Sequence, residues 1–318
     1  MNSNQEKILV TGATGQIGTV LTEALRNAHG EDNVLATDIK KPEEYSGQFE
    51  MLDILNVQRI TEIIADYKIT TIYHLAAILS ASGEWNPQKT WNVNFNAFLS
   101  MLELAQTTGL NKIFFPSTIA VFGTTTPRVQ TPQHTSMIPS TVYGISKTSG
   151  ELWCNYYFNR YGLDVRSVRY PGIISYQSMP GGGTTDYAVD IFHQALQHGT
   201  YTCFLEADTR LPMMYMDDAI RATIELMDAP AENIKVRTSY NLAAMSFTPA
   251  ELAAEIKKHL PDFKIDYKPD HRQVIAASWT ESIDDSEARN DWGWKHQFDL
   301  TTMTSEMLTH LKKKYNHV

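Results

Sequence analysis

The sequence is poor in cysteine, in basic residues and in long apolar runs. Its 318 residues include 2 cysteines, Cys154 and Cys203. They form no Cys-x-x-Cys pair, and no Cys/His cluster has the spacing of a metal site. We therefore expect free thiols in a reducing compartment and no bound metal. The net charge of −9 argues against nucleic acid as a partner, because phosphate binding needs clustered lysine and arginine side chains.

No apolar stretch approaches the length of roughly 20 residues that a membrane helix needs, so we expect no membrane contact. The first seven residues are polar and lead directly into an apolar segment, which is not the pattern of a secretory signal. These features predict a cytoplasmic protein, or the mature form of an organelle protein. A chain of this size can bury roughly 75% of its unfolded surface, so its core needs no disulfides.

Short apolar runs alternate with helical patterns through the first half of the chain. We expect strands at 8–10, 33–37, 71–75, 112–116 and 164–169, with helices at 18–27, 57–67, 91–108 and 142–161. This alternation predicts βαβ units in an α/β fold, a Rossmann-type doubly wound parallel sheet. Ligands of such sheets bind at the carboxyl ends of the strands.

The pattern loosens after residue 170 and predicts a smaller C-terminal substrate-binding lobe. Segment 175–185 is a glycine-rich loop that contains Pro180. We expect further strands at 211–215 and 239–242 and helices at 187–198, 217–227, 249–260 and 300–313. The expected division is a cofactor domain of residues 1–170, to which 217–245 returns, and a lobe of residues 171–216 and 246–318.

A glycine turn joins the first strand to the first helix, with Gly12, Gly15 and Gly18 in a G-x-x-G-x-x-G pattern. Gly12 permits the tight turn, Gly15 lets a phosphate approach the backbone, and Gly18 lets the helix pack closely on the strand. The start of the helix then offers free N–H groups to a pyrophosphate. With a strand before it and a helix after it, this motif predicts dinucleotide binding.

Asp38 ends the second strand, 20 residues beyond Gly18. A carboxylate there accepts hydrogen bonds from ribose hydroxyls and repels a 2′-phosphate, so we expect NAD rather than NADP. Lys40 and Lys41 follow closely and would tolerate that phosphate. Asp53 is expected near the adenine, as a helix N-cap, or as both.

Tyr143 and Lys147 lie four residues apart at the start of a predicted helix, and therefore one turn apart on one face. A free tyrosine, with a pKa of about 10, is a poor base near neutral pH. A neighbouring ammonium favours the phenolate, so this pair suits general base catalysis. Ser117 and Thr118 follow the fourth strand, where one hydroxyl could hold the substrate oxygen or merely cap the strand end.

These motifs resemble the extended short-chain dehydrogenase/reductase family over nearly the whole chain. Gly12-x-x-Gly15-x-x-Gly18, His74-Leu-Ala-Ala77, Asn92-Val-Asn94 and Tyr143-x-x-x-Lys147 occur in the order of that family. The resemblance implies that Tyr143, Lys147 and Thr118 are catalytic and that NAD is the cofactor. The cofactor contacts that it implies are Gly12, Gly15, Gln16, Ile17, Gly18, Asp38, Asp53, Leu75, Ala76, Ala77, Asn94, Ser117, Tyr143, Lys147, Tyr170 and Ile173.

The sequence departs from the sugar-nucleotide enzymes of that family. Gly172 and Ile173 follow Arg169-Tyr170-Pro171, where epimerases usually carry an asparagine. Segments 78–84, 180–187 and 278–294 instead resemble the branch that oxidises L-threonine at C3. That resemblance implies 2-amino-3-oxobutyrate as product, Tyr143 as general base and hydride transfer to the nicotinamide. It also implies a substrate site of Ser80, Thr118, Tyr143, Thr184, Thr185 and Trp279.

Several alternatives stay open at this point. Thr184 and Thr185 could cap the next helix, and Trp279 could belong to the core of the lobe. For Ser80, a substrate role and a purely structural role are about equally open. Two other functions compete: a sugar-nucleotide epimerase or dehydratase, and a non-catalytic dinucleotide sensor. Ile119 and Ala120 follow Thr118 where dehydratases usually carry acidic residues, and sensors tend to lose the tyrosine or lysine.

Two further expectations concern motion and assembly. Three successive glycines after Pro180 predict a lid that closes on the substrate. Members of this family often pair through their long helices, so we expect a homodimer. Its candidate contact residues are Leu99, Leu102, Trp153 and Tyr157, although apolar residues at helical spacing are more often core.

Overall fold

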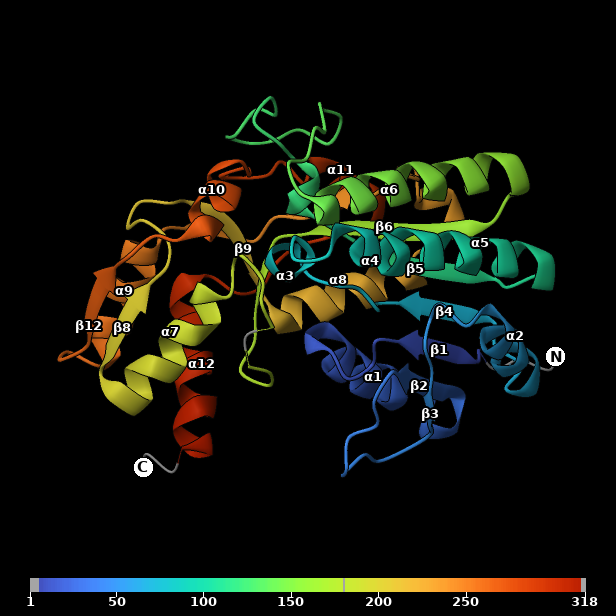
Figure 1. Cartoon of the computed structure of the whole chain (residues 1–318), viewed down its shortest axis with the longest axis horizontal. Coiled ribbons are helices and arrows are strands. Elements are labelled where there is room, and N and C mark those ends of the chain that lie inside the picture. Colours follow the sequence, from blue (N-terminus) through green and yellow to red (C-terminus); the bar gives the residue numbers. More distant parts are fainter. Residues whose placement is uncertain (1–5, 180, 316–318) are drawn as a thin grey trace.

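The computed structural model describes residues 6–179 and 181–315 and has the predicted α/β architecture (Figure 1). A seven-stranded parallel sheet has the strand order β10-β6-β5-β4-β1-β2-β3. The order reverses between β1 and β4, so their carboxyl ends flank the topological switch point. The strands are β1 Ile8–Thr11, β2 Val34–Asp38, β3 Phe49–Met51, β4 Thr71–His74, β5 Lys112–Thr118, β6 Asp164–Tyr170 and β10 Tyr240–Asn241.

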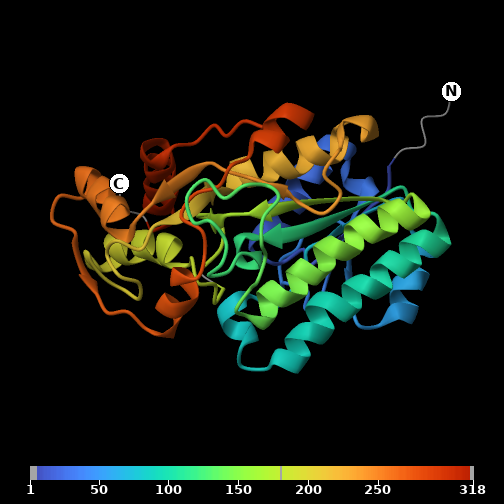
Figure 2. The same ribbon diagram turned by 90° about the horizontal axis from the view of Figure 1, so that it is seen from above.

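Helices cover both faces of this sheet. The alternation of side chains along β1 shows why: Ile8 and Val10 pack on one face and Leu9 on the other. Helices α1 (Gln16–His29) and α8 (Met216–Asp228) cover the first face. Helices α2 (Val57–Asp66), α5 (Ala97–Thr108) and α6 (Val142–Tyr161) cover the second, and Figure 2 shows α5 and α6 side by side.

The expected helix 91–108 is part of a longer helical segment. It begins with α4 (Pro87–Trp91), continues through a π-helical turn (Asn92–Asn96) and runs into α5. Asn86 caps its start by accepting a hydrogen bond from the backbone of Lys89 at 3.1 Å. The wider π turn contains Asn94, whose side chain braces the loop after β4. Such bulges often mark functional sites.

Most of the remaining elements form a lobe beside the carboxyl ends of the sheet strands, at the left in Figure 1. It contains a three-stranded sheet, β11-β9-β7, and a two-stranded sheet, β12-β8. Its strands are β7 Gly172–Ile174, β8 Thr200–Cys203, β9 Leu211–Tyr215, β11 Met245–Phe247 and β12 Lys264–Tyr267. The other helices are α3 Ser80–Gly83, α7 Tyr187–His198, α9 Pro249–His259, α10 His271–Ala277, α11 Ser286–Trp292 and α12 Leu300–Lys314.

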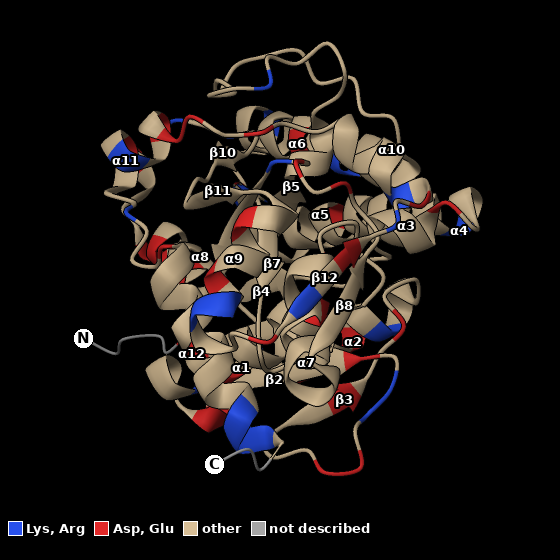
Figure 3. Cartoon of the chain, turned by 90° about the vertical axis from the view of Figure 1, so that its left-hand side faces the viewer, with Lys and Arg blue, Asp and Glu red and all other residues tan. Residues whose placement is uncertain are grey.

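Capping fixes the helix boundaries of the lobe. Thr248 and Glu251 form a capping box at the start of α9, with Pro249 in the first turn. Helix α12 ends in Lys312, Lys313 and Lys314, where cations complement the helix dipole (Figure 3). Both cysteines are buried free thiols.

No helix in the described ranges is long and apolar enough to cross a membrane. Among the same residues, no group of three or more histidine, cysteine or acidic side chains is placed to hold a metal ion.

Candidate active site

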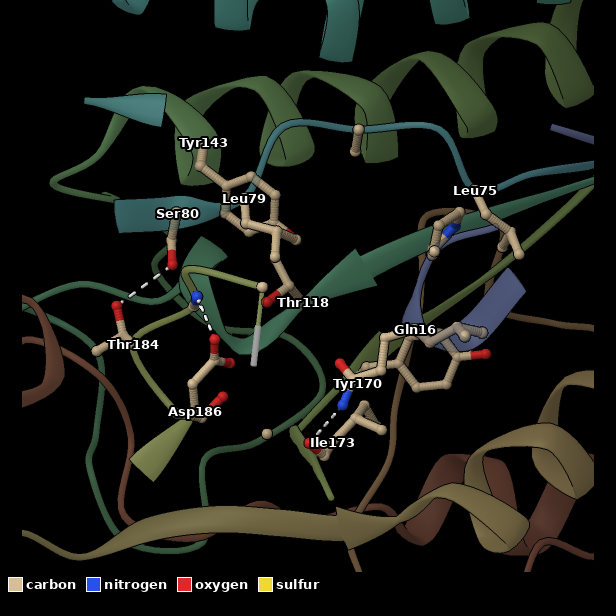
Figure 4. Close-up of a pocket in the computed structure, with 18 of the residues that line it drawn as sticks. Gln16, Leu75, Leu79, Ser80, Thr118, Tyr143, Tyr170, Ile173, Thr184 and Asp186 are labelled. Atoms are coloured by element: carbon tan, nitrogen blue, oxygen red, sulfur yellow. Dashed lines mark hydrogen bonds between the residues drawn. The ribbon is translucent and has the colours of Figure 1, made fainter. Parts of the chain in front are cut away.

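A cavity of about 430 Å³ opens at the carboxyl ends of the central strands. That volume lies within the usual range for small-molecule sites. Its walls come from the β1–α1 turn, the ends of β4, β5 and β6, the start of α6, and residues 178, 179, 181 and 183–186 (Figure 4). Trp279 of the lobe completes the lining. The cavity therefore joins the parallel sheet to the lobe.

The glycine turn is packed too closely for side chains at two of its positions. Gly12 has a φ of +68°, and a Cβ there would lie 2.7 Å from the backbone nitrogen of Ala76. A Cβ on Gly18 would collide with the carbonyl oxygen of Gly12. Gly15 is the N-cap of α1 and provides no capping side chain, so the first amides of the helix stay available. This turn fits a pyrophosphate.

Asp38 lies at the end of β2 and is held against the glycine turn. Its Oδ2 accepts hydrogen bonds from the backbone and the hydroxyl of Thr14, at 3.0 and 2.7 Å. Its Oδ1 accepts from the backbone of Ile39 at 2.7 Å. The carboxylate is thus fixed beside the turn, in position to meet ribose hydroxyls.

The expectation that Asp53 caps a helix is wrong. The N-cap of α2 is Asn56, whose side chain accepts from the backbone of Arg59. Asp53 is exposed, and its Oδ1 accepts from the backbone of Leu55 two residues later at 2.9 Å. Its side chain shapes the turn before α2 instead.

The segment after β4 passes along the cavity and is braced from behind. Leu75 and Ala77 line the cavity. Buried Asn94 accepts from the backbone N–H of Ile78 at 2.8 Å and donates to its carbonyl oxygen at 2.9 Å. Asn94 thereby fixes this segment, and it is not one of the described residues that line the cavity. Gln16, Ile17, Tyr170 and Ile173 line the same cavity.

Tyr143, Lys147 and Thr118 meet in the cavity. Thr141 caps α6 by accepting from the backbone of Gly144 at 3.1 Å, which sets the direction of the first turn. Tyr143 and Thr118 line the cavity together, and the side chain of Thr118 is near enough to the phenol to affect its pKa. Lys147 donates to the carbonyl oxygen of Pro116 at 2.7 Å, and its Nζ lies 5.8 Å from the centre of the Tyr143 ring.

Strand β5 does not end at Pro116, as the sequence suggested, but continues to Thr118. The strand alternation separates the two hydroxyls. Ser117 donates to Glu151 at 2.5 Å, on the α6 side of the sheet. Thr118 is left beside Tyr143, so it is the one suited to hold a substrate oxygen.

Burial changes the acid–base properties of this group. It raises the pKa of Tyr143 to about 12, although the side chain of Thr118 opposes the rise. It lowers the pKa of Lys147 to about 7, while Cys154 and Glu151 act in the opposite direction. Paired groups with strongly shifted pKa values in a cleft are typical of catalytic sites.

The far end of the cavity is small and polar. The hydroxyls of Ser80 and Thr184 lie 3.2 Å apart, and both residues are buried. Thr185 also lines the cavity. Trp279 is 4% exposed and packs in the core of the lobe while it contributes to the lining, so its core placement is confirmed and its contact with a substrate stays a prediction.

Neither threonine caps α7, since the N-cap position belongs to Asp186. Asp186 is the residue that sequence reasoning missed. Its Oδ2 accepts from the backbone of Gly182 and Gly183, at 2.8 Å each, and burial raises its pKa. It is the only acidic side chain among the described residues that line the cavity. The available signal was an acidic residue directly after two threonines that were already suspected.

Gly181 and Gly183 line the cavity. Pro180, named with them as a lid, lies outside the described residues. Closure of the lid stays a prediction.

A doubly wound sheet with a glycine turn at its switch point and a Tyr–Lys–Thr group beside it defines a dinucleotide-dependent enzyme of the short-chain dehydrogenase/reductase type. The chain belongs to the NAD dependent epimerase/dehydratase family, whose model matches residues 8–243. NAD is therefore the cofactor that the glycine turn serves.

Individual relatives and solved structures show a more specific similarity. The chain is 50% identical over 310 residues to the mitochondrial L-threonine 3-dehydrogenase of Bos taurus, covering 96% of this chain and 83% of that protein. It is 55% identical to a GalE-like L-threonine dehydrogenase from Cupriavidus necator in its holo form, with a TM-score of 0.95 and coverage of 96% and 100%. A monomeric L-threonine 3-dehydrogenase from a metagenome is 50% identical, with a TM-score of 0.94 and coverage of 96% and 99%.

Proposed function

We propose that this chain oxidises L-threonine at C3 to 2-amino-3-oxobutyrate with NAD. One observation carries the proposal. Tyr143, Lys147 and Thr118 line one cavity together with the glycine turn and a small polar end, whose only acidic residue among the described lining residues is Asp186. The relatives named as L-threonine dehydrogenases support the same reaction.

The residues of the chain move one proton and hold one oxygen. NAD, when bound, supplies the acceptor for the hydride that leaves C3. Tyr143 takes the proton of the C3 hydroxyl, and Thr118 holds the same oxygen through a hydrogen bond. Because burial holds the pKa of Tyr143 at about 12, the tyrosine needs a positive neighbour to act as a base. The ammonium of Lys147, one helical turn away, provides that charge.

Recognition of the amino acid follows from the polar end of the cavity. An α-ammonium group needs an anionic acceptor, and Asp186 offers one. The carboxylate of the substrate needs donors, which the hydroxyls of Ser80, Thr184 and Thr185 supply. Trp279 excludes water from the apolar side. A small zwitterion is thereby matched by one charge and several neutral donors.

The lining also disfavours a sugar nucleotide. A second diphosphate requires cationic partners, and Lys147 is the only basic side chain among the described lining residues. No observation favours the non-catalytic sensor, because the tyrosine, the lysine and the threonine are present together.

The deciding experiment mixes the purified protein with NAD and L-threonine and follows NADH absorbance. L-serine, L-allo-threonine and NADP serve as controls. Selective NADH formation with L-threonine supports the proposal. Absence of NADH with all three amino acids, in protein that binds NAD, rejects the substrate and returns attention to sugar nucleotides.

A homodimer is part of the proposal, with a revised contact surface. Leu102 and Tyr157, named as candidates, are buried within the chain against the sheet and cannot face a partner. Helix α6 instead exposes Ile145, Leu152 and Tyr156, a large apolar surface for a monomer. The monomeric relative argues the other way. A molar mass of one chain at every concentration in light scattering rejects the dimer, and a dimer that Leu152→Glu dissociates supports it.

The division into two parts is also a proposal. Helix α8 packs with α1 in one core, and β10 pairs with β6, which supports the return of 217–245 to the cofactor domain. Residues 171–216 and 246–318 supply most of the core that surrounds Phe192 and Phe247, to which residues 119–122 also contribute.

A further inference from the structure

A buried ion pair lies directly behind the Tyr–Lys–Thr group and has no part in the mechanism described so far. Glu151 is completely buried, and Arg169 is 2% exposed. The guanidinium meets the carboxylate in a two-pronged arrangement, with Nη2 to Oε2 at 2.7 Å and Nε to Oε1 at 3.0 Å. Burial of two charges is costly unless further hydrogen bonds complete both of them. The partners of each charge therefore indicate what the pair does.

The partners of Glu151 belong to the active site. Glu151 follows Lys147 by four residues on α6, and Tyr143 by eight, so the three side chains share one face of the helix. Its Oε1 also accepts from the hydroxyl of Ser117 at 2.5 Å. Ser117 immediately precedes Thr118. One carboxylate thus contacts the strand end that carries Thr118 and lies one turn beyond the lysine.

The partners of Arg169 belong to the segments that lead to the lobe. Its Nη1 donates to the carbonyl oxygen of Gln133 at 3.0 Å and to Oδ1 of Asn241 at 2.9 Å. Asn241 in turn donates to the carbonyl oxygens of Thr131 and Asp284, at 3.1 and 3.0 Å. The positive end of the pair is therefore anchored away from the cavity, and its negative end is oriented toward α6 and β5.

The charges around Lys147 leave Glu151 as its one anion among the described residues near it. On α6, burial raises the pKa of the Cys154 thiol, which is therefore neutral. From β4, His74 is neutral as well, because burial lowers its pKa to about 3. From β5, the lysine meets the Pro116 carbonyl oxygen and the face of the Phe115 ring, 4.6 Å from its Nζ.

We propose that Glu151 is a positioning residue that keeps the buried Lys147 in its ammonium form and fixes the Ser117–Thr118 strand end beside Tyr143. The proposal deepens the dehydrogenase function and rests on it for its effect on turnover. Arg169 orients the carboxylate and cancels its charge toward the rest of the core. Without the negative charge of Glu151, burial and the positive charge of Arg169 both disfavour the ammonium form of Lys147. The pKa of Lys147 therefore falls, and its proton is lost at lower pH.

The test replaces Glu151 with glutamine, which can still accept from Ser117 but carries no charge. Selective labelling of lysine Cε with carbon-13 allows the titration of Lys147 to be followed by NMR, with Lys147→Arg used to assign its signal. We expect the titration midpoint of Lys147 to fall by about one pH unit or more. The alkaline limb of the kcat/KM profile for L-threonine should move down by the same amount, and Glu151→Asp should restore both.

Asp218→Asn is the matched control. Asp218 is also completely buried, pairs with Arg221, and accepts from the backbone of Gln297 and Phe298, yet it does not line the cavity. It should lower the melting temperature and leave the Lys147 titration unchanged. Should Glu151→Gln not fold, the double variant Glu151→Gln/Arg169→Gln removes both charges and should shift the midpoint in the same direction.

The outcomes are separable. A Lys147 midpoint within 0.3 pH units of wild type in the folded Glu151 variants, a margin well below the expected shift, overturns the proposal. Failure of the wild type to oxidise L-threonine rejects the proposed function alone, because the lysine titration is read without substrate or cofactor.

Discussion

The hydroxyl oxygens of Ser80 and Thr184 lie 3.2 Å apart although 104 residues separate them in the sequence. Ser80 begins α3, shortly after the carboxyl end of β4, and Thr184 belongs to the segment that enters the lobe. Their contact closes the polar end of the cavity and sets its size. The substrate pocket is therefore built from both parts of the chain, and both hydroxyls are available to one small carboxylate.

Tyr143→Phe removes the proposed base and keeps the ring. We expect turnover of L-threonine to fall about 1000-fold, because general base catalysis typically contributes a factor of 100 to 10,000. NAD binding, measured by calorimetry, should stay within a few-fold of wild type. Tyr176→Phe is the control, since Tyr176 stacks on His310 and does not line the cavity. Unchanged turnover in Tyr143→Phe refutes the assignment of the base.

Asp186→Asn should raise KM for L-threonine about 10- to 100-fold, the cost of one hydrogen bond to a charged group. The asparagine can still accept from the amides of Gly182 and Gly183, so the loop is kept. In wild type the pKa of Asp186 is raised by burial. KM should therefore rise as the pH falls and the carboxylate takes up a proton, whereas KM of the variant should not follow that titration.

Asp190→Asn is the matched control for Asp186, because Asp190 lies in the first turn of α7 and outside the cavity lining. Its KM should equal that of wild type across the same pH range. Equal KM values for Asp186→Asn and wild type would remove Asp186 from the substrate site.

Asp38→Ala and Asp53→Ala separate the two carboxylates assigned to the adenosine half of the cofactor. Asp38 is fixed beside the glycine turn by Thr14, so its loss should weaken NAD and reduce the preference for NAD over NADP about tenfold or more. Asp53 is exposed and bonded to its own turn, so its loss should change NAD affinity less. The ratio of kcat/KM values for the two cofactors measures the difference. An unaltered ratio in Asp38→Ala means that the ribose is read elsewhere.

Lys147→Met should make the unfolding free energy less dependent on pH. The folded pKa of Lys147 is lowered from 10.5 to about 7, so between these values the unfolded chain binds more protons than the folded chain. Wild type therefore gains stability as the pH rises through this window. Urea unfolding at pH 7 and pH 9.5 should show the variant more stable than wild type at pH 7, by a margin that narrows at pH 9.5. A constant margin contradicts the shifted pKa.

Local sequence patterns predicted the fold class and most elements of the sheet because each rests on short-range physics. The bounds of α6 and α7 follow from caps and helical periodicity, and both match the expected ranges 142–161 and 187–198. Strand β3 and the lobe strands β7, β8, β11 and β12 were missed. They have three or four residues each, and such short runs carry too little periodicity to distinguish them from loops.

The sequence by itself determined the glycine turn and the helical spacing of Tyr143 and Lys147. Backbone geometry and helical spacing place the glycines, Asp38, Tyr143 and Lys147, and each of these is encoded in a short segment of the chain. Only the tertiary structure decided the rest. It turned Ser117 toward Glu151 and Thr118 toward Tyr143, made Asn94 a brace, and brought Asp186 into the cavity. These outcomes depend on which side chains, distant in sequence, pack together in the folded chain. Local sequence patterns do not specify those contacts.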